Sequence, residues 1–112
     1  MRASKDFSEV SPDEEFDRGF EFISRFSFAD DEVVSSVLFC LCEAVSGTDA
    51  GAQSHVGNTS VLASESSGRV TVAAVRLSGL LAAVTYRITM RVLTDRGQVL
   101  ELYADQPCLA RD

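Results

Sequence analysis

Polar and apolar side chains alternate most regularly over residues 84–92. A strand has a two-residue period, so residues at even positions share one face and those at odd positions share the other. The turn at 94–97 and the run 98–103 predict a second strand, antiparallel to the first, in a β-hairpin. The even set is apolar and the odd set polar: Tyr86, Ile88, Met90 and Val92 against Arg87, Thr89 and Arg91.

Other short segments have strand composition, with turns between them. The phenylalanine-rich stretch 16–28 is predicted to be extended from about Gly19 to Ser24, with a short helix as the alternative. Three further segments are predicted to be strands: 33–44, 61–63 and 69–77. No segment predicts a helix beyond one turn. This pattern predicts an all-β fold, an antiparallel β-sandwich of about seven strands.

Tyr86 adds a detail to this fold. In immunoglobulin-like sandwiches a tyrosine near the start of the penultimate strand hydrogen-bonds back across a corner, and the connection 78–83 is where that corner falls. We therefore predict an immunoglobulin-like sandwich over residues 16–112, preceded by an extended N-terminal leader, residues 1–15. Residues 1–11 have no period, and we expect them to be loose.

The segment 33–44 is apolar on both predicted faces. A strand with two apolar faces is buried on both. One face of a two-layer domain normally meets water, so we expect either the leader or another subunit to cover the second face. One face carries Val37, Phe39 and Leu41, and the other carries Leu38, Cys40 and Cys42.

The chain has 112 residues, 46% hydrophobic and 24% charged, as expected of one globular domain. Its longest apolar run is six residues, too short for a membrane helix, and its N-terminus has no apolar signal core. We expect it to be made and kept in a cytoplasm unless a particle carries it out.

The net charge is −7, and the first 32 residues hold ten acidic against four basic residues. This charge argues against nucleic-acid binding and indicates either a solvated face or a steering patch for a basic partner.

The chemistry-bearing residues form no catalytic motif. The sequence has no Gly-x-Ser-x-Gly, no phosphate-binding glycine loop and no His-Glu-x-x-His, so we predict no enzyme, no catalytic residue and no cofactor. Three cysteines and one histidine are too few, in this spacing, to predict a metal site. His55 lies in the glycine- and serine-rich loop 46–60 and is expected at the surface. Cys40, Cys42 and Cys108 are either buried reduced thiols or partners in an inter-subunit disulfide.

Several stretches together resemble a family of small tailed-bacteriophage virion proteins, the fiber-tail adaptors, which have an immunoglobulin-like sandwich. The resemblance covers about residues 12–104. It starts in the acidic and aromatic segment 13–22, continues through the acidic turn and strand at 31–39, and is best over 75–92, where Val75-Arg76-Leu77-Ser78-Gly79 precedes Thr85-Tyr86-Arg87-Ile88-Thr89. A tryptophan of the pattern is replaced by Phe22 or Phe39, and the loop 46–60 is longer.

The resemblance implies a structural role, joining tail or neck components to fibers through protein–protein contacts. It implies a virion location after assembly in the host bacterial cytoplasm, a ring-shaped homo-oligomer, and other virion proteins as partners, with no nucleic acid and no membrane. The alternatives are another virion component of the same fold (capsid decoration, head–tail completion or tail-tube module) or a free binding module. The residues predicted to form the subunit interface are Leu38, Cys40, Cys42 and Phe16.

Overall fold

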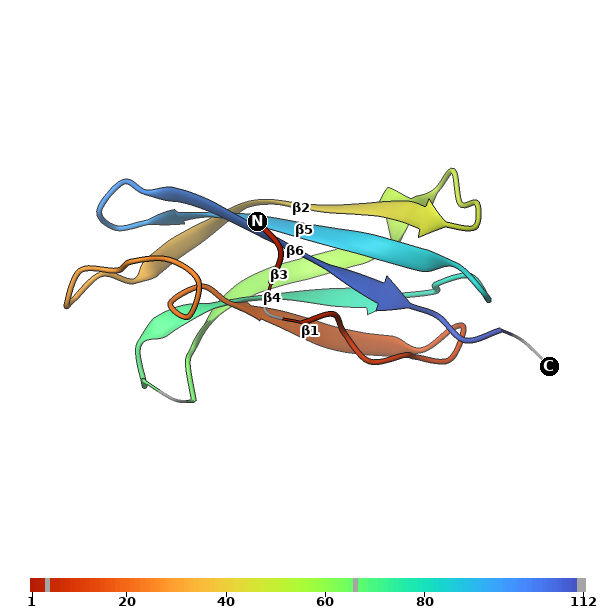
Figure 1. Ribbon diagram of the computed structural model, residues 1–112, viewed down its shortest axis with the longest axis horizontal. Helices are drawn as coiled ribbons and strands as arrows, with labels where there is room; N and C mark the ends of the chain where they lie inside the picture. Colours follow the sequence, from red (N-terminus) through yellow and green to blue (C-terminus); the bar gives the residue numbers. More distant parts are fainter. Residues whose placement is uncertain (4, 66, 111–112) are drawn as a thin grey trace.

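The alternating side chains place the core between two three-stranded antiparallel sheets. The structure is a computed structural model that describes residues 1–3, 5–65 and 67–110. One sheet has the order β1-β4-β3 and the other β2-β5-β6, and they lie face to face (Figure 1). The predicted antiparallel β-sandwich is confirmed, with six strands in the described residues: β1 Glu15–Glu21, β2 Val34–Ser46, β3 Val56–Ala63, β4 Val70–Ser78, β5 Thr85–Thr94 and β6 Val99–Pro107.

The predicted hairpin is β5 and β6. Tyr86, Ile88 and Met90 are fully buried against the opposite sheet, whereas Arg87 and Arg91 are partly exposed on the outer face. The turn closes at Gly97, which has a φ of 84° and donates its N–H to the carbonyl of Thr94 at 3.1 Å. A positive φ is accessible to glycine without a Cβ clash, so this residue allows the tight reversal.

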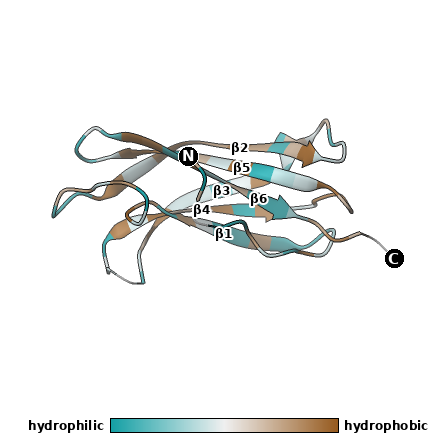
Figure 2. Cartoon of the chain, viewed as in Figure 1, coloured by the Kyte–Doolittle hydropathy of each residue, from teal (hydrophilic) through white to brown (hydrophobic). Residues whose placement is uncertain are grey.

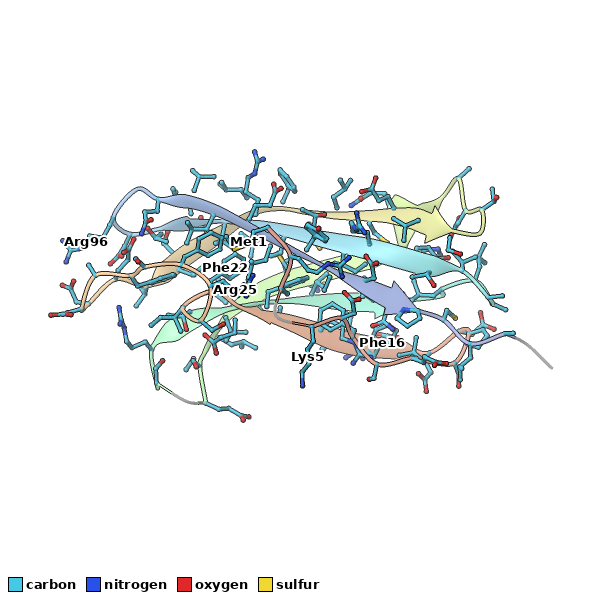
Figure 3. The ribbon with its side chains drawn as sticks, in the orientation of Figure 1. Met1, Lys5, Phe16, Phe22, Arg25 and Arg96 are labelled. Carbon is cyan, nitrogen blue, oxygen red and sulfur yellow. The ribbon has the colours of Figure 1, made fainter. Side chains whose placement is uncertain are left out.

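The phenylalanine-rich stretch is extended, as predicted, but its strand lies earlier than predicted. β1 ends at Glu21, and the chain then turns at Phe22, whose carbonyl accepts hydrogen bonds from the N–H groups of Arg25 and Phe26. Phe20 and Phe22 are buried in the core, and Figure 3 shows Phe22 between the two sheets. The predicted strand at 61–63 is the end of β3, which begins inside the predicted loop 46–60 and follows a single-turn 3-10 helix, η1 Ala52–His55.

The leader is held in place rather than loose. It runs parallel to β6 and forms two isolated β-bridges, Arg2 with Tyr103 and Val10 with Cys108. The chain then turns at 11–14 and enters β1 in the opposite sheet, as the red segment in Figure 1 shows. Composition alone did not reveal this pairing, because a strand at a sheet edge can be stabilised by backbone hydrogen bonds without a side-chain period.

β2 contains β-bulges that break its two-residue period. Its register against β5 shifts between Val34 and Ser36, between Val37 and Phe39, and between Ala44 and Ser46. An extra residue in one strand has no partner and changes which following residues face the core. Leu38 is such an unpaired residue. Phe39 is therefore exposed, although a two-residue period counted from Val37 would place it on the same face as Val37.

Candidate functional site

The shift at Leu38 gives β2 an apolar outer surface. Leu38 is 47% exposed, Phe39 40%, Leu41 42% and Val45 44%. We call these four residues the β2 apolar surface. Figure 2 shows that β2 is hydrophobic over the middle of its length. Single exposed apolar residues are common on proteins, but several on one strand indicate an interaction site.

The same shift places the cysteines in the core, so the predicted shared face of Leu38, Cys40 and Cys42 is wrong. Cys40 and Cys42 are buried and pair across the ladder with Met90 and Ile88. Cys108 is buried at the end of β6. Within this single chain the three thiols are free and buried, which favours the first of the two alternatives, buried reduced thiols.

Burial also fixes the chemistry of two of these thiols. It raises the pKa of Cys40 to about 12. It also raises the pKa of Cys42 to about 12, with smaller contributions from Cys40 and from the carboxylates of Asp49 and Glu43. Since the thiolate is the nucleophile and the metal ligand, a raised pKa keeps both groups unreactive.

Phe16 lies away from the β2 apolar surface. It belongs to β1, in the other sheet, and is half-buried. Its ring centre lies 4.7 Å from the guanidinium carbon of Arg18, within the range of a cation–π contact. The predicted interface residues therefore do not form one surface: Leu38 is exposed on one sheet, Phe16 lies on the other, and the two cysteines are buried.

β2 is an edge strand, and the side chain of Gln53 forms two hydrogen bonds with its outer edge. Cys42 donates its N–H to Gln53 Oε1 at 2.9 Å, and Gln53 Nε2 donates to the carbonyl of Cys40 at 2.8 Å. The amide of Gln53, in η1, thereby makes the pair of hydrogen bonds that a neighbouring strand would make. A shallow, mainly apolar hollow of about 340 Å³ lies beside it, lined by Phe39, Cys40, Leu41 and Gln53.

The outer face next to Phe39 is ordered by charge pairs. The Arg91 guanidinium carbon lies 4.7 Å from the centre of the Phe39 ring, and its nitrogens contact Glu101 at 2.8 and 2.9 Å. Arg87 forms the equivalent pair with Asp105 at 2.9 Å. The arginines are thus held flat along the sheet, and the apolar side chains of β2 border a polar, charge-paired area.

A buried hydrogen-bond network holds the loop that carries Gln53. The Tyr86 hydroxyl accepts the N–H of Leu81 at 3.0 Å and donates to Asp49 Oδ2 at 2.6 Å. His55 Nε2 lies 2.7 Å from the same carboxylate oxygen. The bond to Leu81 is the predicted tyrosine corner. The prediction of His55 as a surface residue is wrong, because its side chain is 12% exposed.

The electrostatics of this network favour a structural role over a catalytic one. Hydrogen bonds from Tyr86 and then His55 lower the pKa of Asp49. Burial, and then the bond to Asp49, raise the pKa of Tyr86 far above its ordinary value. A tyrosine that acts as nucleophile or base at neutral pH needs a lowered pKa, so this hydroxyl serves as a neutral donor and acceptor.

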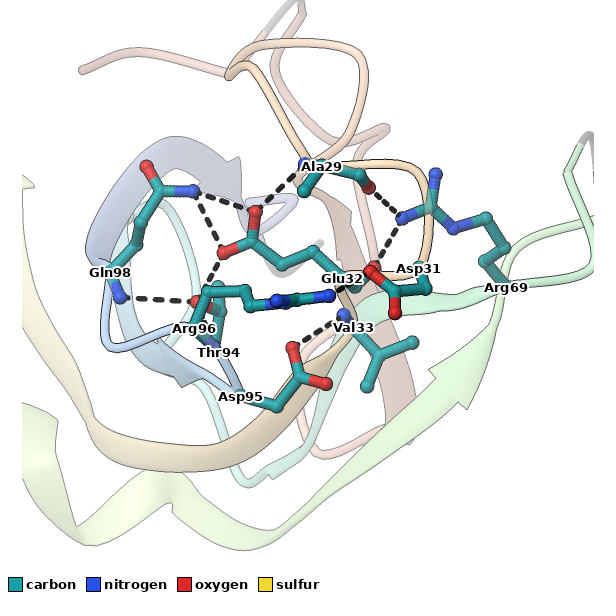
Figure 4. A network of polar contacts seen from close by, with 9 residues as sticks. All are labelled: Ala29, Asp31, Glu32, Val33, Arg69, Thr94, Asp95, Arg96 and Gln98. Carbon is teal, nitrogen blue, oxygen red and sulfur yellow. Dashed lines mark hydrogen bonds and ion pairs between the residues drawn. The ribbon is translucent and has the colours of Figure 1, made fainter.

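A second network lies at the opposite end of β2 (Figure 4). The buried carboxylate of Glu32 accepts hydrogen bonds from Thr94 Oγ1, from Gln98 Nε2 at 2.8 and 3.0 Å, and from the Ala29 N–H at 2.9 Å. These bonds, led by that of Thr94, lower its pKa. Arg69 donates to the carbonyls of Ala29 and Glu32. The network joins the turn before β2 to the β5–β6 hairpin.

Sequence reasoning missed both networks, because their partners are distant in sequence. Asp49 and Tyr86 are 37 residues apart, and Glu32 and Thr94 are 62 apart. A useful signal was available for one of them: an aspartate in the loop opposite a predicted tyrosine corner is a candidate acceptor for its hydroxyl.

In residues 1–3, 5–65 and 67–110, no group of three or more His, Cys, Asp or Glu side chains is placed to hold a metal ion. No helix of this same part of the chain has the length and apolarity needed to cross a membrane. Comparison with family models, with curated proteins and with solved structures finds no match to this chain.

Proposed function

We propose that this chain is a bacteriophage virion structural protein, an adaptor that joins tail or neck components to fibers. The observation that carries the proposal is the β2 apolar surface on an open sheet edge, because apolar side chains on an edge strand favour docking to another protein. A connector needs such a surface on a rigid support. The ladder of β2 with β5 and the two buried networks provide that support.

The topology supports the immunoglobulin-like part of the proposal. If β1 to β6 are read as strands B to G, the two sheets have the orders B-E-D and C-F-G, as in immunoglobulin constant-type domains. The leader departs from that arrangement, because it pairs with β6 in the C-F-G sheet, whereas the first strand of a constant-type domain lies in the other sheet. Tyr86 makes the corner hydrogen bond. The segments that carry the family resemblance include β1 and the stretch from β4 to β5.

The test of this function is incorporation into particles. We expect the protein to be found by mass spectrometry in purified virions of a phage that encodes it, and imaging to place it at the tail or neck. A small ring number favours the tail axis, whereas hundreds of copies favour a capsid decoration protein. Finding it only as a free protein, absent from particles, contradicts the proposal, and a saturable hit on a glycan array supports a free binding module instead.

A matched pair of variants tests the surface. Leu41→Arg places a charge in the β2 apolar surface, and Leu62→Arg places one on β3, where Leu62 is 49% exposed. We expect both proteins to fold, and only Leu41→Arg to lose incorporation into particles, by at least about tenfold. Equal incorporation of the two variants removes β2 as the docking surface.

A further inference from the structure

The leader occupies a complementary site along β6 through backbone pairing. Ala3 donates its N–H to the carbonyl of Tyr103 at 2.7 Å, and Phe7 donates to the carbonyl of Asp105 at 3.0 Å. At the far end, Leu109 donates to the carbonyl of Val10 at 2.8 Å. β5 pairs with one edge of β6, and the leader pairs with the other.

Side chains make the fit specific. The Phe7 ring packs edge-on against Phe20 with ring centres 5.3 Å apart, and Arg18 lies over Phe7 at 5.4 Å. The side chain of Gln106 is fully buried. It accepts a hydrogen bond from Arg18 Nε at 2.7 Å and donates one to the carbonyl of Ser8 at 2.9 Å. Removing the leader would expose Phe20 and break these contacts, and the leader of a second copy would restore all of them.

The turn that connects the leader to β1 is short and strained. It spans residues 11–14, with Pro12 at its second position, and is closed by a hydrogen bond from the Glu14 N–H to the Ser11 carbonyl at 3.4 Å. Asp13 has a φ of 67°, a backbone conformation that costs free energy in a residue with a Cβ. Opening the turn into an extended connection relieves that strain.

We propose that the leader exchanges between copies of this chain, so that residues 1–10 of one copy pair with β6 of the next. Exchange reproduces every contact of the leader in the neighbour, and a short strained hinge favours the open connection. The partner is therefore a second copy of this chain, and the interface is the site that the structure already shows filled. This inference does not depend on the proposed virion function.

A cysteine placed in the leader reports which copy it pairs with. Val10 and Cys108 are bridge partners, and both side chains are buried. The side chains of such partners are close enough for a disulfide, so Val10→Cys in the full chain can bond to Cys108 under mild oxidation. We expect covalent dimers and longer ladders on non-reducing gels, which collapse on reduction and are absent from Val10→Cys with Cys108→Ala. Oxidised protein that runs only as monomer overturns the proposal.

Two glycine variants test the hinge without touching the core. Asp13 and Ala83 are the two non-glycine residues of the described chain with positive φ, at 67° and 62°. Asp13→Gly relieves strain in the closed turn, so we expect the dimer dissociation constant in light scattering to rise about fivefold, while Ala83→Gly leaves it unchanged. An unchanged constant in Asp13→Gly, or an equal change in both variants, contradicts exchange.

The unmodified protein gives an independent reading if Val10→Cys does not fold. Full-length protein labelled with heavy isotopes is mixed with unlabelled protein and followed by native mass spectrometry. We expect mixed oligomers at high protein concentration, and we expect them to persist in Leu41→Ser, which excludes association through the β2 apolar surface. A purely monomeric protein up to about millimolar concentration overturns the proposal.

Discussion

The sheet β2-β5-β6 has two edges, and a glutamine contacts each in a different way. At the β6 edge, Gln106 is fully buried and joins the leader to β1 through Ser8 and Arg18. At the β2 edge, Gln53 is exposed and bonds only to the backbone of Cys40 and Cys42. The first edge is paired with the leader, whereas the second is contacted by the side chain of Gln53 and is paired with no strand in the described residues. The difference indicates that the β6 edge contributes to the stability of the fold, whereas the β2 edge is available for contact with another protein.

Truncating each glutamine measures the difference between the edges. Gln106→Ala leaves the Ser8 carbonyl and Arg18 without their buried partner, so we expect a loss of about 2–3 kcal/mol in the free energy of unfolding. Gln53→Ala removes two hydrogen bonds at an exposed site and is expected to cost about 0.5–1 kcal/mol. Urea denaturation of both variants provides the measurement. Equal losses would show that the two edges are covered to the same extent.

Tyr86→Phe tests the support of the open edge. The variant keeps the buried ring but removes the hydroxyl that joins Leu81 to Asp49. Both groups then lose a partner in a poorly solvated place, and we expect a loss of about 1–2 kcal/mol in thermal or urea denaturation. Hydrogen exchange should show the loss of protection concentrated at the Cys42 amide, with little change at the Phe7 amide on the covered edge. A uniform change would contradict a local role.

Acid should loosen the open edge through Asp49. The folded protein lowers the pKa of this carboxyl, so its contribution to stability is complete above the ordinary aspartate pKa and is lost as the pH falls through the lowered value. Glu32 has the same sign. We expect stability to be highest near neutral pH and to fall below about pH 4. Urea denaturation at several pH values measures this, and Asp49→Asn should fall less steeply than the native chain.

The smallest effect on folding is expected at the β2 apolar surface itself. Leu41→Ser removes an exposed side chain, so the free energy of unfolding should change by no more than about 0.5 kcal/mol. Circular dichroism and urea denaturation check this value. A loss of 2 kcal/mol or more would mean that Leu41 contributes to the fold, and that β2 is not available as a surface.

The sequence predicted those parts of the fold whose period is unbroken. Tyr86, Ile88 and Met90 are buried as expected, and the corner bond of Tyr86 forms. The period cannot show an added residue, so Leu38 was grouped with Cys40 and Cys42. The leader and His55 were misplaced for another reason: they are held by backbone pairing and by Asp49, both of which bring together residues that are distant or without a pattern in the sequence.

The bulge at Leu38 has a consequence for how this domain can change over generations. An added residue lets the strand present two neighbouring side chains, Leu38 and Phe39, to the outside while Val37 and Cys40 on either side still point inward. The outward pair can thus be exchanged for other side chains without altering the interior, so the domain can acquire a new partner at little cost to folding.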